Sequence, residues 1–294
     1  DPAVRQRGFQ ECPITEMARP VVKASAKPTG ANTFPSVLEH LLIEATTGRK
    51  GPVLLDLAAD VQKMEIPIGS TDHLPSAPFP EPARPDAVDA VAEALRRSKR
   101  PVILVGGGLR GSELALLRFA ESCHIPVFPT WNAIDLVPEA SAVYGGRVGT
   151  YGGPGRNFAI QNSDFLLCIG TRISGRITGG KPTSFAPHAW RVLVDVSIPA
   201  GDHLDLRFHE RLSTTAQVFL SLFAAHDFRG ADGPWMEWLD QVRDWRSMYE
   251  PVFLHQKRSA DGINPYEFVS RLSRVAGSHD VIVSDCGGTA VIVH

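Results

Sequence analysis

A run of three glycines, Gly106-Gly107-Gly108, is the clearest pattern in this chain that could do chemistry. It follows the apolar run 101–105, which is typical of a buried strand, and it precedes a helical pattern over 112–122 with Ser112 as its N-cap. Glycines in such a turn let the backbone approach a ligand, and the free N–H groups at a helix start attract an anion. The run does not complete a G-x-G-x-x-G fingerprint, because Gly111 falls one place early. It therefore fits either a nucleotide site or a tightly packed turn.

Two arginines follow a second apolar strand pattern. Arg172 and Arg176 come just after residues 165–170. Open parallel sheets bind ligands at the carboxyl ends of their strands, and guanidinium groups suit diphosphate oxygens. The sequence predicts an anion site here, and two solvated surface arginines are the alternative.

Residues 145–155, called the glycine loop below, contain six glycines in eleven residues. They lie directly before a short helical pattern over 156–161. This density exceeds what a routine turn needs and indicates a loop that a ligand approaches closely.

No residue pattern predicts nucleophilic catalysis or a metal centre. The chain has no G-x-S-x-G elbow, and its ten histidines show no metal-ligand spacing. Four widely spaced cysteines form no C-x-x-C pair and indicate free thiols in a reducing compartment: Cys12, Cys123, Cys168 and Cys286. We predict no catalytic residue and no metal ligand within these residues.

Composition is that of an ordinary globular protein. The 294 residues are 43% hydrophobic and 21% charged, with a formal net charge of -2, which gives no basic field for nucleic acid or an anionic membrane. No apolar run approaches the roughly 20 residues of a membrane span. These features predict a cytoplasmic protein without nucleic-acid or membrane partners, and the length suits about two domains.

The middle of the chain alternates strand and helix patterns with short connections. Such alternation predicts an α/β fold with a parallel, Rossmann-like sheet over residues 86–226. The expected strands are 101–105, 125–128, 165–170 and 192–196, and the expected helices are 86–95, 112–122, 156–161 and 214–224.

The flanking blocks are smaller. Residues 1–66 contain an expected helix over 37–45 and an expected strand over 53–57, which favour a parallel sheet. A proline-rich stretch over 67–85 predicts a linker. A second linker, residues 227–261, contains a helix whose tryptophans share one face and either pack on the domain or form a binding platform.

The last block, residues 262–294, combines an expected helix over 264–275 with an apolar run, 281–285, that is typical of a buried strand entering a glycine turn. The chain begins at Asp1 without methionine and stops at His294, soon after that turn. A strand and turn of this kind normally open a domain, so we expect a piece of a longer protein.

Several stretches, in this order and spacing, resemble the acetolactate synthase-like branch of thiamine-diphosphate enzymes. They are Arg5-Gln6-Arg7-Gly8-Phe9-Gln10-Glu11, the segment from Thr47 to Gln62 (TGRKGPVLLDLAADVQ), the segment from Asn162 to Arg172 (NSDFLLCIGTR) and Val281-Ile282-Val283-Ser284-Asp285-Cys286-Gly287.

The resemblance implies three α/β domains. Residues 1–66 then correspond to the C-terminal part of the pyrimidine-binding domain, 86–226 to a complete central FAD- or nucleotide-binding domain, and 262–294 to the start of the diphosphate-binding domain. The family's catalytic glutamate and its G-D-G…N motif for magnesium lie outside these portions. The parent enzyme is thus expected to use thiamine diphosphate and Mg2+, while this piece alone is expected to be inactive.

The resemblance also implies site residues. Phe9 and Gln10 match positions near the active-site entrance, and Lys23 matches a lysine of the substrate channel. The positions that match FAD contacts in the flavin-containing branch are Arg49, Gly106, Gly107, Gly108, Thr130, Trp131, Gly149, Gly170, Arg172, Arg176 and Asp195.

Three departures bear on the flavin. The chain has Gly149-Thr150-Tyr151-Gly152 where the synthases have Gly-Met-His-Gly, Asp195-Val196-Ser197-Ile198-Pro199 where they have D-x-D-P, and Ser213-Thr214 near their later Gly-Asp. They leave open whether FAD is retained and whether the product is acetolactate.

The resemblance implies that the parent, a homodimer or homotetramer, makes or breaks a carbon–carbon bond next to a carbonyl. Its substrates would be a 2-keto acid and an aldehyde or keto acid acceptor. Two alternatives stay open: a flavin-linked redox or hydrolytic member of the superfamily, and a non-catalytic nucleotide-binding or assembly module.

Overall fold

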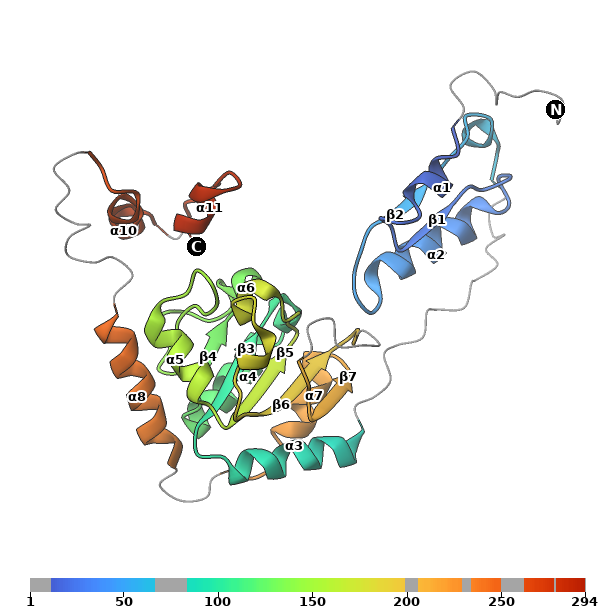
Figure 1. Cartoon of the computed structure of the whole chain (residues 1–294). Coiled ribbons are helices and arrows are strands. Elements are labelled where there is room, and N and C mark those ends of the chain that lie inside the picture. The colour runs from blue at the N-terminus through green and yellow to red at the C-terminus, as the bar shows by residue number, and fades with distance from the viewer. Residues whose placement is uncertain are drawn as a thin grey trace. The chain divides into compact units, whose positions relative to one another are not determined.

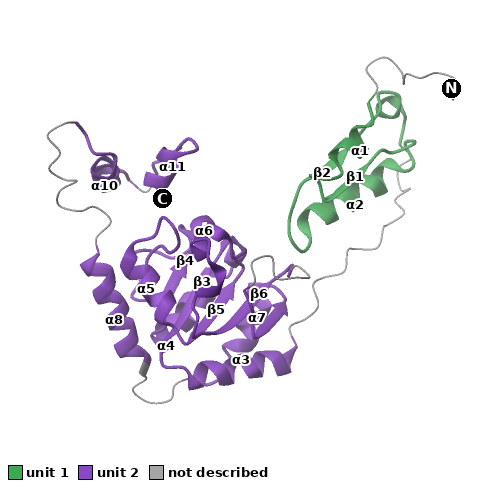
Figure 2. Cartoon of the chain, viewed as in Figure 1, with its two compact units in different colours: residues 1–80 green, residues 81–294 purple. Residues whose placement is uncertain are grey.

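The computed structural model describes residues 12–66, 84–198, 206–228, 234–249, 262–277 and 279–293. It divides into two compact units, Asp1–Pro80 and Glu81–His294 (Figure 2). The boundary lies inside the proline-rich stretch that the sequence predicts as a linker.

The second unit is built around a parallel sheet. Its elements are α3 (Pro85–Arg97), β3 (Pro101–Val105), η2 (Gly107–Leu109), α4 (Glu113–Cys123), β4 (Val127–Pro129), η3 (Trp131–Ala133), α5 (Pro154–Asn162), β5 (Phe165–Ile169), α6 (Gly175–Thr178), η4 (Pro182–Ser184), β6 (Trp190–Asp195), β7 (Glu210–Ser213), α7 (Ala216–Phe223), α8 (Pro234–Met248), α10 (Pro265–Val275) and α11 (Gly288–Val293).

Five strands form this sheet in the order β4-β3-β5-β6-β7, and every neighbouring pair is parallel (Figure 1). The α/β fold with a parallel, Rossmann-like sheet is confirmed. After β4 the chain returns to the other side of β3, so β3 lies between β4 and β5. The strand order therefore reverses at β3, which is the kind of switch point where open sheets bind ligands.

Alternating side chains of the strands belong to two hydrophobic cores, one on each face of the sheet. Ile103 and Val105 of β3 pack with apolar residues of α3, α4 and α7, whereas Val102 and Leu104 pack with those of α5 and α8. All four are essentially inaccessible to solvent. Burying each such side chain contributes roughly 1.5–3 kcal/mol, which explains why the central strands read as continuous apolar runs.

The tryptophans of α8 pack on the domain as one of the two interpretations predicted. Trp235 and Trp238 are each 6% exposed, and their indole N–H groups donate to the carbonyls of Ser98 and Pro101 at 3.0 Å. Met248, in contrast, is 68% exposed. Within the described residues, no helix has the length and apolar character needed to cross a bilayer.

The first unit contains α1 (Ile14–Ala18), β1 (Ala24–Ala26), α2 (Phe34–Thr46), β2 (Val53–Leu55) and η1 (Val61–Lys63). β1 and β2 pair in parallel with Ser25 opposite Leu54, and α2 packs on both strands. The predicted helix over 37–45 and strand over 53–57 correspond to α2 and β2, whereas β1 was not predicted.

Two further expectations differ from the structure. The expected buried strand over 281–285 is wrong: these residues have no regular structure, and Val283 is 88% exposed. A parallel strand is stable only beside partner strands, and no described strand pairs with this run. Ser112 stands at the N-cap of α4, but its side chain makes no capping bond; Glu113 accepts the N–H of Gly111 at 2.8 Å instead. The edge strand β7 was not predicted.

Candidate functional site

The carboxyl ends of β3 and β5 place two predicted site segments side by side. Val105 of β3 lies opposite Ile169 of β5, so the turn Gly106–Gly108 meets the turn that begins at Gly170. Two hydrogen bonds join these turns, from Gly106 N–H to the Ile169 carbonyl at 3.0 Å and from Gly108 N–H to the Gly170 carbonyl at 2.9 Å. The structure therefore brings the glycine run and the arginine segment together at the switch point.

Close packing accounts for three of these glycines. A Cβ on Gly106 would lie 2.3 Å from the Gly170 carbonyl oxygen, and a Cβ on Gly108 would lie 2.8 Å from Gly170 Cα. Gly170 also has a φ of +57, and its own Cβ would lie 2.5 Å from the carbonyl carbon of Gly108. The packed-turn interpretation explains why these positions are glycine, and a direct role in ligand binding stays a prediction.

Aromatic side chains and a guanidinium gather next to this turn. Trp131 begins η3, directly after Thr130, whose N–H donates to the Val105 carbonyl at 2.8 Å. The rings of Trp131 and Tyr151 meet edge to face at 5.8 Å, and the guanidinium of Arg176 lies 6.0 Å from the centre of each ring. Both distances are within reach of a cation–π attraction.

The middle of the glycine loop is tied to this cluster. Gly149 has a φ of +98, and a Cβ there would lie 2.5 Å from the Arg176 carbonyl oxygen. That carbonyl accepts the N–H of Thr150 at 2.7 Å and its hydroxyl at 3.0 Å. The Asn157 amide pairs with Gly149, accepting its N–H at 2.9 Å and donating to its carbonyl at 3.0 Å. Glycine at 149 is thus required by a close approach and a left-handed backbone.

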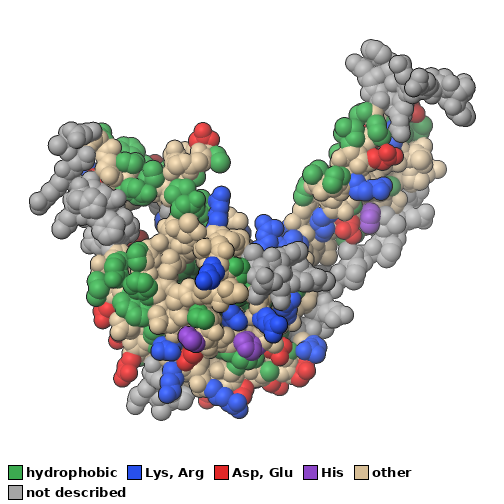
Figure 3. Space-filling model, viewed as in Figure 1, with side chains coloured by type: hydrophobic (Ala, Val, Ile, Leu, Met, Phe, Trp, Pro, Cys, Tyr) green, Lys and Arg blue, Asp and Glu red, His purple; other side chains and the backbone are tan. Residues whose placement is uncertain are grey.

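The charge at this edge is unbalanced. Arg172 and Arg176 are both exposed, and neither has a carboxylate within ion-pair distance in the part of the chain described. Arg110, on the neighbouring turn, is already paired with Asp135 at 3.0 Å. Along the lower rim of the second unit, Lys and Arg side chains lie among Asp and Glu side chains (Figure 3). Two guanidinium groups without an acidic partner suit a phosphate or diphosphate ligand.

Asp195 ends β6 one strand further along the same edge. It is 7% exposed, and its carboxylate accepts the N–H of Ser197 at 3.1 Å. Thr214, beyond the end of β7, donates its N–H to the Asp195 carbonyl at 3.1 Å. The carboxylate therefore already has a partner within the protein.

Two candidate residues belong to the first unit, which is described separately. The ammonium of Lys23 donates to the carbonyls of Glu44 and Thr47, the latter at 2.9 Å. These carbonyls end α2, where a cation is favoured by the helix dipole, so Lys23 caps this helix. Arg49 follows in the next turn. Phe9 and Gln10 lie outside the described residues, and their predicted roles, like that of Lys23 in a channel, stay predictions.

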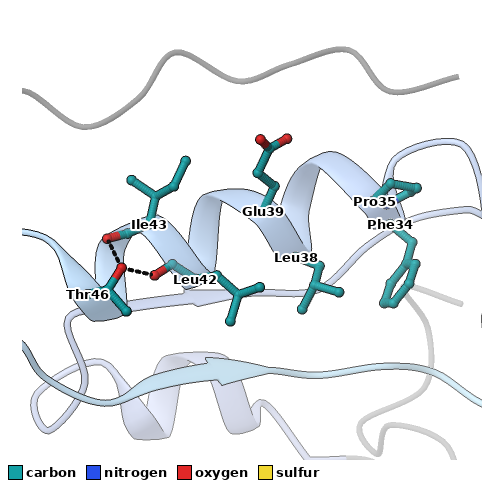
Figure 4. Close-up of a pocket in the computed structure, with 7 residues that line it drawn as sticks. All are labelled: Phe34, Pro35, Leu38, Glu39, Leu42, Ile43 and Thr46. Carbon is teal, nitrogen blue, oxygen red and sulfur yellow. Dashed lines mark hydrogen bonds between the residues drawn. The ribbon is translucent and has the colours of Figure 1, made fainter. Parts of the chain in front are cut away.

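A pocket in the first unit does not coincide with any predicted site residue. It runs along α2 from Phe34 to Thr46 (Figure 4). Leu38 and Leu42 point to one side of the helix, and Glu39 and Ile43 to the other (Figure 4). Its lining is mostly apolar, with Glu39 and Thr46 as the polar members.

Sequence reasoning missed three residues that complete the cluster: Thr150, Tyr151 and Asn157. Their position in or just after the glycine loop was the available signal, but only the structure shows that they meet Arg176 and Gly149. Among the residues the structure describes, no group of three or more His, Cys, Asp or Glu side chains could hold a metal ion.

Comparison with known proteins gives a consistent result. Residues 88–211 match the family "Thiamine pyrophosphate enzyme, central domain". "Probable acetolactate synthase 2, chloroplastic" of Oryza sativa subsp. japonica is 35% identical over 192 residues, which cover 64% of this chain and 29% of that protein. "Probable acetolactate synthase large subunit" of Methanocaldococcus jannaschii is 29% identical over 295 residues, which cover 95% of this chain and 49% of that protein. The chain thus spans at most about half the length of these relatives.

Proposed function

Because residues 88–211 belong to the thiamine pyrophosphate enzyme central-domain family, and because the homologues of this chain are acetolactate synthases, we propose that it is part of a carbon–carbon bond-forming or bond-breaking enzyme. The substrates would be a 2-keto acid and an aldehyde or keto acid acceptor. Thiamine diphosphate and Mg2+ would be the cofactors of the whole protein.

We assign this chain no residue of the thiamine diphosphate site. We also propose that residues 1–294 alone are inactive in the reaction. In the whole protein we expect cytoplasmic localisation and a homodimer or homotetramer, which light scattering during size-exclusion chromatography would measure.

The role we propose for the central domain is to bind a nucleotide with a diphosphate group, of which FAD is one. The single observation that carries this is the pair Arg172 and Arg176, exposed at the sheet's switch point without a carboxylate partner in the described residues. The N–H groups of Gly106 and Gly108 already donate within the protein, so the diphosphate would be held by guanidinium groups rather than by the glycine turn.

Trp131 and Tyr151 add ring surfaces beside Arg176, against which a base or flavin ring could pack. FAD in this position would serve as a structural cofactor and would take no electrons from the substrate.

The carbon chemistry is tested on the full-length protein with thiamine diphosphate, Mg2+ and a panel of 2-keto acids. We expect release of carbon dioxide that depends on both cofactors. No release from any 2-keto acid would contradict the proposed reaction. A flavin absorption band that stays unchanged on substrate addition supports the structural role, whereas bleaching of the band supports the redox alternative.

A further inference from the structure

Helix α8 holds the chain just before the glycine loop through two arginines. Arg243 donates from Nε and Nη2 to the Ala142 carbonyl at 3.1 and 2.7 Å. Arg246 donates to the Tyr144 carbonyl at 2.8 Å, and its guanidinium lies 5.2 Å from the centre of the Tyr144 ring. Each bond joins residues about one hundred positions apart in the chain. The packing of α8 on the domain therefore fixes the backbone of residues 142–144.

The same helix, together with Tyr249 directly after it, holds the end of the loop. A Cβ on Gly155 would lie 2.4 Å from the Trp245 carbonyl oxygen, so α5 begins in direct contact with the α8 backbone. Arg156 donates to the Tyr249 carbonyl at 2.8 Å. Partial burial lowers the pKa of Arg156, and a partly buried guanidinium is stabilised by its hydrogen-bond partner. Two glycines leave room for the Arg156 side chain: Gly146 and Gly153.

The middle of the loop, between these two sets of contacts with α8 and Tyr249, lies at the candidate site. Residues 149–151 contact Asn157, the Arg176 carbonyl and the Trp131 ring. Within the described residues, the hydrogen bonds and ring contacts of the α8 side chains do not include Tyr151 or Arg176. An effect of α8 on these two side chains would therefore pass through the loop.

We propose that Arg243 and Arg246 are positioning residues, which hold the chain at the start of the glycine loop on α8 so that Tyr151 is kept beside Arg176 at the nucleotide site. The ligand part of this statement rests on the proposed nucleotide-binding role. The loop part does not, because the conformation of the loop can be measured without a ligand.

The loop part is tested by amide hydrogen exchange on the full chain. In Arg246→Met, exchange at the N–H groups of residues 149–152 should rise about tenfold, because a charge-assisted bond to backbone is lost, while exchange in β3 and β5 stays unchanged. Arg246→Lys keeps a cation over Tyr144 and should restore part of the protection. Arg97→Met is the matched control, since the partner of Arg97 among the described residues is Glu93 on α3.

Arg243→Met gives a second test if Arg246→Met folds poorly, and the same loop amides should respond. Unchanged exchange at residues 149–152 would overturn the proposal. An equal rise at all amides of the second unit would also overturn it, because it would show a loss of stability without a specific effect on the loop.

The ligand part is tested with ADP as the probe in equilibrium dialysis. Arg246→Met should weaken ADP binding about fivefold or more in the presence of Tyr151, but less than about twofold in a Tyr151→Ala background, because the arginine acts through that side chain. Equal losses in the two backgrounds would overturn the assigned route. Absence of ADP binding by the unsubstituted chain would refute the nucleotide site, and the exchange result would still decide the role of α8.

Discussion

The substitution Gly106→Ala probes the packed turns at the switch point most sharply. Gly106 has an extended backbone, with φ of -118 and ψ of -176, which alanine adopts without strain. The only obstacle is contact: the new Cβ would lie 2.3 Å from the Gly170 carbonyl oxygen and 2.5 Å from Thr171 Cα. Both partners are backbone atoms, so no flexible side chain can move aside.

The expected loss in the free energy of unfolding is about 3 kcal/mol. Separating the turns to an ordinary contact needs a shift of about 1 Å, and overpacking of this kind costs roughly 1–3 kcal/mol. The shift also stretches two hydrogen bonds between the turns, each of which contributes about 1 kcal/mol. Gly175→Ala is the matched control, because nothing lies within 4 Å of its Cβ position and its φ is not positive.

Urea unfolding followed by tryptophan fluorescence measures this loss. All five tryptophans lie between residues 131 and 245, so the signal reports on the second unit. Gly175→Ala should stay within about 0.5 kcal/mol of the unsubstituted chain. Gly111→Ala, where φ is +87 and the space is open, should lose about 1–2 kcal/mol from backbone strain alone. A Gly106→Ala variant as stable as Gly175→Ala would refute the packed-turn interpretation.

Three further predictions concern buried groups of the same unit. Trp238→Phe should lower the free energy of unfolding, measured in urea, by about 1–3 kcal/mol, because the Pro101 carbonyl loses its hydrogen-bond donor. Trp245→Phe is the control, because the indole N–H of Trp245 donates to no described residue. Equal losses in the two variants would contradict the reasoning. Burial raises the pKa of the Cys168 thiol, so iodoacetamide should alkylate exposed Cys286 and spare Cys168 in the native chain, as peptide mass spectrometry would show. The raised pKa also means that stability falls as pH rises above about 8.5, where the unfolded thiol loses its proton first, and Cys168→Ala should reduce that slope; an unchanged slope would contradict it.

Much of the central fold could be predicted because its strands are buried on both faces. β3 and β5 read as continuous apolar runs for that reason, and their bounds fall within one residue of those expected. β7 was missed because it contains the polar residues Glu210 and Arg211 and therefore lacks an apolar pattern. Its pairing with β6 is what makes it a strand. The run at 281–285 shows the opposite error, since an apolar run without partner strands does not form a sheet.

The candidate site was only partly predictable. Strand ends placed Gly106 and Arg172 at one edge of the sheet, because parallel strands bring their carboxyl ends together. The contact between Tyr151 and Arg176 depends on the path of the glycine loop, and that path is fixed by α8 from about one hundred residues away. Local sequence patterns carry no information on such a contact.

Equilibrium dialysis of the full chain with FAD and with ADP tests the central structural claim most directly. We compare the unsubstituted chain with the double variant Arg172→Met/Arg176→Met and with Arg97→Met/Arg110→Met, a control that removes the same number of charges from paired positions. We expect that at least one nucleotide binds, that the first double variant binds it at least about tenfold more weakly, and that the control binds within about twofold of the unsubstituted chain. Equal binding by the two double variants, or no binding of either nucleotide by the unsubstituted chain, would contradict the claim.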